Sequence, residues 1–147
     1  MNDIIKDMPN IRNLIAKQKA FYDSIVSVNC PFLGESVYFK SDGFHHLLNK
    51  YPNKRRPINE TYLKLMCFTH APEIIANSMK IIEIRKEEIK IKGKLKDVIS
   101  YELVDGKKRT DNIAVIVRKI GTGKLRFRSV KKISSKRYAS KKAPFGA

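Results

Sequence analysis

The chain has 147 residues, of which 42% are hydrophobic, and it carries 31 Lys or Arg against 14 Asp or Glu. These values fit one domain with a single core, exclude wholesale disorder, and leave no apolar run long enough to cross a bilayer. The segment Lys80–Ala147 holds 21 of the basic residues and only 7 acidic ones. A surplus of this size indicates a polyanionic partner, so we expect the protein to bind nucleic acid.

The first half of the chain predicts helices. Apolar residues between Ile11 and Ile25 recur at helical spacing, interrupted by the polar Gln18, which predicts an amphipathic helix over Pro9–Val26. A short strand is expected at Val37–Phe39, and the proline-containing Asn49–Pro57 is expected to be an exposed basic loop. Four further segments are expected, a linker and three shorter helices. The linker is Asn29–Gly34, and the helices are one that carries Phe44–Leu48 after a turn at Ser41–Gly43, one over about Ile58–Phe68 and one over about Pro72–Met79.

The second half of the chain predicts strands. From Lys80 onward apolar and polar residues alternate, as in Ile82-Glu83-Ile84-Arg85, and turns are expected at Asp105-Gly106 and Gly121–Gly123. The expected fold is therefore α+β, with N-terminal helices packed on an antiparallel sheet of about four strands. We expect one domain over residues 1–130, with its N-terminal helix within 1–28, and a basic, mobile extension over residues 131–147.

Cysteine content bears on compartment and metal binding. Cys30 and Cys67 are expected to be reduced, packing thiols, although a disulfide is left open. With three histidines and no Cys-x-x-Cys pair, the sequence offers no convincing set of zinc ligands, and no cofactor is expected. The acidic start of the chain, without an apolar leader, favours a cytoplasmic protein of bacterial or viral origin.

Two adjacent histidines, His45 and His46, are the candidates for acid–base chemistry. An imidazole can accept and release a proton near neutral pH, because its ordinary pKa is roughly 6.5. Neighbouring residues on a helix point about 100° apart, so one imidazole should face the sheet and the other solvent or a cleft. The alternative is that one histidine is a satisfied interior residue and the other a surface cap.

Arginines are the candidates for binding phosphate. Arg55 and Arg56 could hold a phosphate bidentately, or they could simply be solvated. Arg85 and Arg118 lie on apolar strand patterns, where a guanidinium needs water, an anion or a cross-strand carboxylate. The sequence contains no P-loop, Rossmann pattern or nucleophile elbow. It is also poor in acids, which argues against a two-metal nuclease.

The last expected strand adds basic residues and one hydroxyl. Simple alternation over Leu125–Val130 predicts Leu125, Phe127 and Ser129 on one face, with Arg126 and Arg128 on the other. The Ser129 hydroxyl could bind a phosphate oxygen, or equally a backbone carbonyl.

A succession of short motifs resembles a known group of nucleases. Val37-Tyr38-Phe39, Gly43-Phe44-His45-His46-Leu47 and Arg55-Arg56-Pro57 occur in this order, followed by Glu83-Ile84-Arg85 and by Ala114–Val130. Over about residues 37–130 the chain resembles the phage-associated branch of the barnase–EndoU–colicin–RelE-like ribonucleases. The resemblance implies a barnase/RelE-like α+β fold and metal-independent cleavage of RNA, as in a toxin or a phage-encoded effector.

The resemblance also implies roles for individual residues. His46 matches the family's histidine and would be the acid or base, with His45 as the fallback. Arg85 and Arg56 would stabilise the phosphorane formed when the 2′-OH attacks the phosphorus, and Ser129 would orient the phosphate. The second proton-transfer group stays unassigned. RNA contacts are expected from seven further residues: Lys54, Arg55, Arg118, Arg126, Arg128, Lys131 and Lys132.

The sequence leaves several partners and two other functions open. RNA is the expected partner, and the sequence does not choose among substrates such as tRNA and ribosome-bound mRNA. It also leaves open whether an antitoxin or immunity protein is a second partner. A noncatalytic RNA- or ribosome-binding module would explain the charge equally well. A structural protein of a virion or mobile element, docking an acidic protein on its basic sheet, is the third reading.

Overall fold

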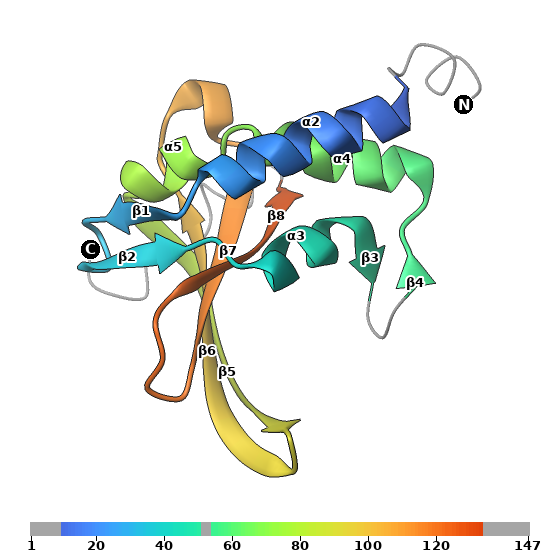
Figure 1. Ribbon diagram of the computed structural model, residues 1–147. Helices are drawn as coiled ribbons and strands as arrows, with labels where there is room; N and C mark the ends of the chain where they lie inside the picture. The colour runs from blue at the N-terminus through green and yellow to red at the C-terminus, as the bar shows by residue number, and fades with distance from the viewer. Residues whose placement is uncertain (1–9, 51–53, 134–147) are drawn as a thin grey trace.

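The computed structural model describes residues 10–50 and 54–133, and it is an α+β fold in which helices precede most of the strands (Figure 1). The helices are α2 (Ile11–Ser24), α3 (Ser41–Leu48), α4 (Ile58–Phe68), α5 (Ala71–Ala76) and the 3₁₀ helix η1 (Lys108–Thr110). The strands are β1 (Ser27–Cys30), β2 (Glu35–Tyr38), β3 (Asn49–Lys50), β4 (Lys54–Arg55), β5 (Lys80–Ile91), β6 (Lys94–Val104), β7 (Ile113–Ile120) and β8 (Arg126–Lys132).

The main sheet has six strands rather than the expected four or so. Its order is β1-β2-β8-β7-β6-β5, and its neighbours are antiparallel except β2 and β8, which are parallel and meet at Tyr38 and Arg126. The prediction missed β1, because its four residues Ser27–Cys30 merge into a proline- and glycine-containing segment that resembles a linker. That segment is instead the turn that joins β1 to β2.

The segment between α3 and α4 also differs from the prediction. Instead of an exposed loop, Asn49-Lys50 and Lys54-Arg55 pair as a small antiparallel sheet. Arg56 directly after it is buried, with 9% of its surface exposed. The guanidinium of Arg56 can be buried because α3 and α4 supply its hydrogen-bond acceptors, which are described below with the site.

An aromatic cluster forms the centre of the core between helices and sheet. Tyr22 of α2 contacts the rings of Phe39, Phe44, Phe68 and Phe127, all at centroid distances of 6.0 Å or less. Such ring pairs contribute roughly 0.5–1.5 kcal/mol each beyond the area that they bury. This cluster joins α2, α3 and α4 to β8, and so fixes the helices relative to the last strand.

Gly43 allows α3 to lie unusually close to β8. A Cβ atom at this position would lie 2.8 Å from the backbone oxygen of Phe127 and 2.9 Å from its ring, and it would overlap the hydroxyl of Tyr22. That hydroxyl donates a hydrogen bond to the backbone oxygen of Lys40, just before α3. The glycine therefore sets the distance between α3 and the sheet.

The polar interruption of the α2 stripe is explained by a contact between helices. The amide of Gln18 is buried and donates to the backbone oxygen of Leu65 at 3.2 Å and to the hydroxyl of Thr69 at 2.9 Å. Gln18 thus ties α2 to α4, and its polar group is satisfied inside the core.

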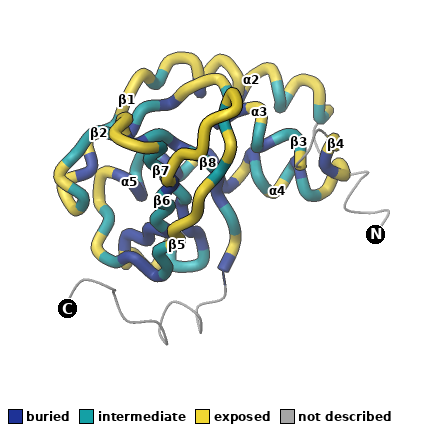
Figure 2. Tube along the Cα trace, turned by 90° about the horizontal axis from the view of Figure 1, so that it is seen from below, coloured by how far each residue is buried: buried dark blue, intermediate teal, exposed yellow. Residues whose placement is uncertain are grey.

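Strands β5 and β6 form the longest hairpin of the fold and extend past the rest of the sheet (Figure 1). The last ladder pair between β6 and β7 joins Val98 to Ile120, so the residues nearer the turn pair within the hairpin. Along both strands the chain passes from buried positions near the core to exposed positions toward the turn (Figure 2). We refer to Ile89–Lys96 as the arm.

Three other expectations concern the thiols, membrane spans and the C-terminal segment. Cys30 and Cys67 are both free and buried, as expected. Within the described part of the chain, no helix combines the length and hydropathy that a membrane crossing requires. Lys131 and Lys132, expected at the start of a mobile extension, belong to β8 instead, and the remainder of that extension lies outside the described residues.

Candidate functional site

A cavity of about 310 Å³ lies between the helices α3 and α4 and one face of the sheet. The register of the strands shows that this face of the sheet points away from the hydrophobic core. Along it, Arg85 lies beside Ser100, Ser100 lies beside Arg118, and Ile116 lies beside Ser129. The cavity is lined by one imidazole, five cations, three carboxylates, two serine hydroxyls, one tyrosine and one isoleucine: His46; Lys64, Arg85, Arg118, Arg128 and Lys131; Glu83, Glu87 and Glu102; Ser100 and Ser129; Tyr101; and Ile116.

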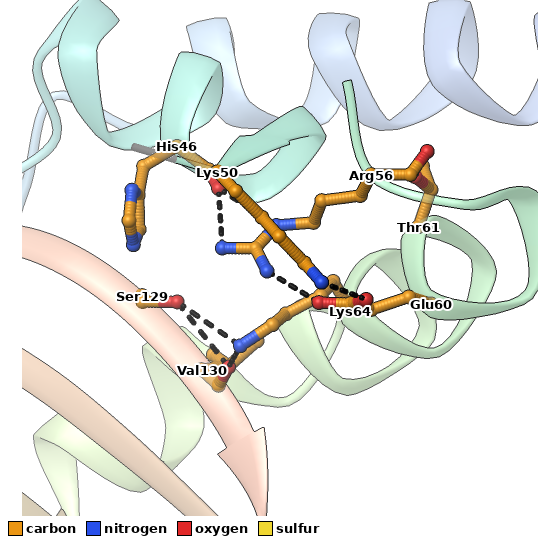
Figure 3. Close-up of polar contacts among 8 residues, drawn as sticks. All are labelled: His46, Lys50, Arg56, Glu60, Thr61, Lys64, Ser129 and Val130. Carbon is orange, nitrogen blue, oxygen red and sulfur yellow. Dashed lines mark hydrogen bonds and ion pairs between the residues drawn. The ribbon is translucent and has the colours of Figure 1, made fainter. Parts of the chain in front are cut away.

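His46 reaches the cavity from α3, and its ring points toward Ser129 (Figure 3). The pKa of its imidazole is lowered to about 4, first because the ring is half-buried and then because Arg128, Arg56, Lys64 and Arg118 lie around it. At neutral pH the ring is therefore uncharged and able to accept a proton.

Arg56 holds the backbone of His46 in place through hydrogen bonds. Its Nε and one terminal nitrogen donate to the backbone oxygen of His46 at 3.2 and 3.1 Å, and its other nitrogen bonds Glu60 at 2.5 Å. Its backbone N–H also donates to the backbone oxygen of Leu48 at 3.0 Å. Arg56 does not line the cavity, so its guanidinium positions the end of α3 and adds positive charge near the imidazole.

Lys64 reaches the same cavity from α4. Its ammonium donates to the backbone oxygen of Val130 at 2.6 Å and lies 3.4 Å from the hydroxyl of Ser129 (Figure 3). Burial, together with the charge of Arg56, lowers the pKa of Lys64 to about 8. The group is thus still largely protonated at neutral pH, yet gives up its proton more readily than an exposed lysine.

A bulge in the β7–β8 ladder brings both Arg128 and Ser129 to the cavity. The register shifts between Ile116, which faces Ser129, and Val117, which faces Phe127, so Arg128 is the extra residue. Phe127 belongs to the core whereas Ser129 lines the cavity, which corrects the alternation expected for this strand. The prediction was wrong because a bulge adds one residue to one strand and reverses the alternation beyond it.

Arg118 and Arg128, the two sheet arginines that act on His46, are half-buried and lie close enough for their charges to repel each other. Burial lowers the pKa of both Arg118 and Arg128, and for Arg128 the charge of Arg118 is the next cause. The Nε of Arg118 is buried and has no hydrogen-bond partner among the described residues. A bound anion would supply an acceptor and would offset the repulsion between the two guanidinium groups.

Two of the three carboxylates in the cavity are neutralised by ion pairs. Glu83 pairs with Arg85 at 3.2 Å along β5, and Glu102 pairs with Lys131 at 2.5 Å across the sheet. Arg85 thus pairs with a glutamate, but along its own strand and not across the sheet as the sequence allowed. Neither Arg118 nor Arg128 has such a pair at the distances recorded for the described residues, so these two sheet arginines are the better candidates for binding a ligand.

The remaining candidate residues lie away from the cavity. His45 is exposed and lines a separate hollow between α2 and α3, where its Nδ1 lies 3.4 Å from the amide of Asn49. Arg126 shares the cavity's face of the sheet but pairs with Asp42 at 3.5 Å. Lys54 and Arg55 are exposed on β4, and Lys132 lines a smaller hollow beside α4.

Sequence reasoning missed Lys64, although the sequence carries a signal for it. Thr61, Leu65 and Phe68 are buried at helical spacing in α4, and Lys64 lies in the same stripe. A lysine within an apolar helical stripe needs water or a hydrogen-bond acceptor for its ammonium group. Here β8 supplies the acceptors, and the sequence of α4 alone does not reveal this contact.

Comparisons with family models, with curated proteins and with solved structures found no match. Among residues 10–50 and 54–133, no group of three or more His, Cys, Asp or Glu side chains is placed to hold a metal ion. The side chains in the cavity are therefore the main structural evidence on function.

Proposed function

We propose that this protein is an endoribonuclease that cleaves RNA by attack of a ribose 2′-OH on the adjacent phosphorus, without a metal ion. The observation that carries the proposal is the grouping of His46, Lys64, Arg118, Arg128 and Ser129 around one cavity. An uncharged imidazole, a readily deprotonated ammonium and two phosphate-binding guanidinium groups are the components that this reaction needs.

The scissile phosphate would bind between Arg118 and Arg128. The guanidinium groups of Arg118 and Arg128 would donate to its nonbridging oxygens, which gain negative charge in the phosphorane. The hydroxyl of Ser129 donates to the backbone oxygen of Val130 at 3.3 Å, the carbonyl contact that the sequence left open, and it would have to turn from that oxygen to orient the phosphate. A bound phosphate also offsets the positive charge around His46, so it raises the pKa of the imidazole from the value of about 4 that burial and this charge produce. Substrate binding would thus make His46 a stronger base.

Two proton transfers complete the reaction. His46 takes the proton of the 2′-OH as the O2′–P bond forms, and Lys64 donates a proton to the 5′ oxygen as the P–O5′ bond breaks. The products are a 2′,3′-cyclic phosphate and a 5′-hydroxyl. Lys64 supplies the second proton-transfer group that the sequence left unassigned, and its lowered pKa favours that role.

The family resemblance is part of the same proposal. A barnase/RelE-like relationship would account for the order of helices and strands, and for a histidine before Leu47 that faces arginines of the last strands. The phage or toxin context, and RNA partners such as tRNA or ribosome-bound mRNA, are proposed on this basis. So are an antitoxin or immunity partner and a cytoplasmic setting.

The test is cleavage of labelled RNA by purified protein in EDTA, comparing wild type with His46→Ala and His45→Ala. His45 is a matched control, because it lies on the same helix and faces a different hollow. We expect His46→Ala to lower the rate at least 100-fold and His45→Ala to leave it near wild type. RNA that is bound but stays intact with wild-type protein would instead support the noncatalytic binding module.

A further inference from the structure

Within residues 10–50 and 54–133, the arm, Ile89–Lys96, is the exposed segment with the largest excess of basic side chains that the proposed reaction does not use. It contains Lys90, Lys92, Lys94 and Lys96, all exposed, and no acid. The two residues at its turn, Lys92 and Gly93, both have positive φ, at 50° and 79°, as a tight two-residue hairpin turn requires. The arm is therefore a regular two-stranded ribbon, and the face on which each side chain lies follows from its register.

One face of the arm continues the face of the sheet that bears the cavity. Arg85 pairs with Ser100, Ile89 with Lys96, and Ile91 with Lys94. Paired residues of an antiparallel ladder lie on the same face, and so does every second residue along each strand. Lys96 and Lys94 therefore lie on the cavity's side of the hairpin, four and six residues along β6 from Ser100, or about 13 and 20 Å.

The two faces of this hairpin differ in charge. Beyond Arg85 and Ser100, the cavity's face carries Lys94 and Lys96 with Glu87 as its acid. The opposite face carries Lys86 and Lys90, but also Glu88 and Asp97, which are direct register partners. Among the paired residues, the two lysines of the opposite face are thus balanced by two acids, whereas the two lysines of the cavity's face meet one acid and leave one net positive charge. Lys92 belongs to the turn and is counted on neither face.

The cavity's face also suits a nucleic acid backbone in shape. Ile89 lies opposite Lys96 and Ile91 lies opposite Lys94, so each lysine stem can cover an isoleucine while its ammonium stays in water. The two ammonium groups stand in one row along β6, which fits a single strand of phosphates rather than a duplex.

We propose that this face of the arm, through Lys94 and Lys96, binds the phosphates of single-stranded RNA that runs outward from the cavity. The inference rests on the proposed function for what lies in the cavity. It specifies the substrate as an RNA strand that extends several nucleotides to one side of the cleaved bond. The arm then adds affinity for long substrates and none for short ones.

Another explanation for exposed lysines on a hairpin is protection against edge-to-edge pairing of strands. That role would use the lysines of both faces alike. The experiment therefore compares Lys94→Ala/Lys96→Ala with Lys86→Ala/Lys90→Ala, which removes the same charge from the opposite face of the same hairpin. The four lysines are all exposed, and the fold of both variants can be checked by thermal unfolding.

Binding is measured with a 2′-O-methyl RNA strand long enough to reach the turn of the arm, over a range of salt concentrations. This probe cannot undergo attack by a 2′-OH, so binding is read independently of cleavage. Removing two phosphate contacts should lower the slope of log K against log salt by about 1.4 and weaken binding roughly tenfold at 0.1 M salt. Lys86→Ala/Lys90→Ala should change the slope by less than half of that, and Lys94→Arg/Lys96→Arg should bind as wild type does.

Equal losses in the two alanine variants, or no loss in either, would overturn the proposed role of the arm. Cleavage of a dinucleotide, which cannot reach the arm, is the separate readout for the cavity. A protein that cleaves the dinucleotide but shows no difference between the faces refutes the arm alone. A protein that cleaves nothing, yet loses binding only in Lys94→Ala/Lys96→Ala, refutes the nuclease and supports the arm.

Discussion

Substituting Gly43 by alanine tests whether the close packing of α3 on β8 sets the position of His46. The added methyl group would lie 2.8 and 2.9 Å from the backbone oxygen and ring of Phe127, and would overlap the Tyr22 hydroxyl. Both neighbours are buried core residues, with 2% or less of their surface exposed, so neither can move aside freely. Either α3 shifts away from the sheet or the clash remains.

The magnitude follows from two opposing effects. Overpacking a well-packed core costs roughly 1–3 kcal/mol, and here two neighbours are crowded at once, so the upper part of that range applies. Alanine in place of glycine within a helix returns about 1 kcal/mol. We expect Gly43→Ala to lower the free energy of unfolding by about 2 kcal/mol, and Tm by about 6 °C. A shift of α3 by 1 Å would lower cleavage by up to about 100-fold.

The assay is urea denaturation of Gly43→Ala, Tyr22→Phe and the double variant, combined with RNA cleavage. Tyr22→Phe removes the hydroxyl that the new methyl group overlaps, so the double variant should lose less stability than the sum of the single losses. The hydroxyl's bond to Lys40 is lost in both backgrounds and cancels in the cycle. A Gly43→Ala protein that is as stable and as active as wild type would refute this reasoning.

Three further predictions concern the residues around the cavity. A pH–rate profile should show kcat/KM rising through about pH 4, as His46 loses its proton, and falling above about pH 8, as Lys64 loses its proton. Lys64→Arg should abolish the fall at high pH. Urea denaturation should show that the free energy of unfolding declines by about 1 kcal/mol from pH 6.5 to pH 4, after allowance for solvent screening. Over this range His46 takes up a proton in the unfolded chain but stays uncharged in the folded protein, so His46→Ala should remove the decline. Arg56→Ala should destabilise the protein by about 2–3 kcal/mol and reduce cleavage. Arg56→Lys should not restore either property, because the single nitrogen of a lysine replaces three guanidinium nitrogens that point to Glu60 and to the His46 carbonyl.

The parts of the fold with a long, regular pattern could be predicted from the sequence. The helical spacing of Ile11–Ile25 and the alternation from Lys80 onward each span many residues, and α2 and β5 lie where these patterns predict them. The pairing of β1 with β2 could not be found in this way, although the strand expected at Val37–Phe39 overlaps β2. These four-residue strands are too short for a period, and they are stabilised by pairing with each other and with the distant β8.

The candidate site could be predicted in part. A histidine in the first half and arginines on later strands are visible as unusual residues for their elements, and the structure brings His46, Arg85, Arg118, Arg128 and Ser129 to one cavity. The role of Arg56 was not visible, because its acceptors are the backbone of α3 and the side chain of Glu60. The bulge at Arg128 was also invisible, since it depends on how β8 pairs with β7.

The chemical identity of the product ends tests the central claim most directly. RNA is incubated with purified protein in EDTA, and the new termini are determined by mass spectrometry. The proposed attack by the 2′-OH predicts fragments that end in a 2′,3′-cyclic phosphate and begin with a 5′-hydroxyl, formed by wild type and not by His46→Ala. Fragments with 5′-phosphate ends, or cleavage only when a divalent ion is added, would contradict the claim.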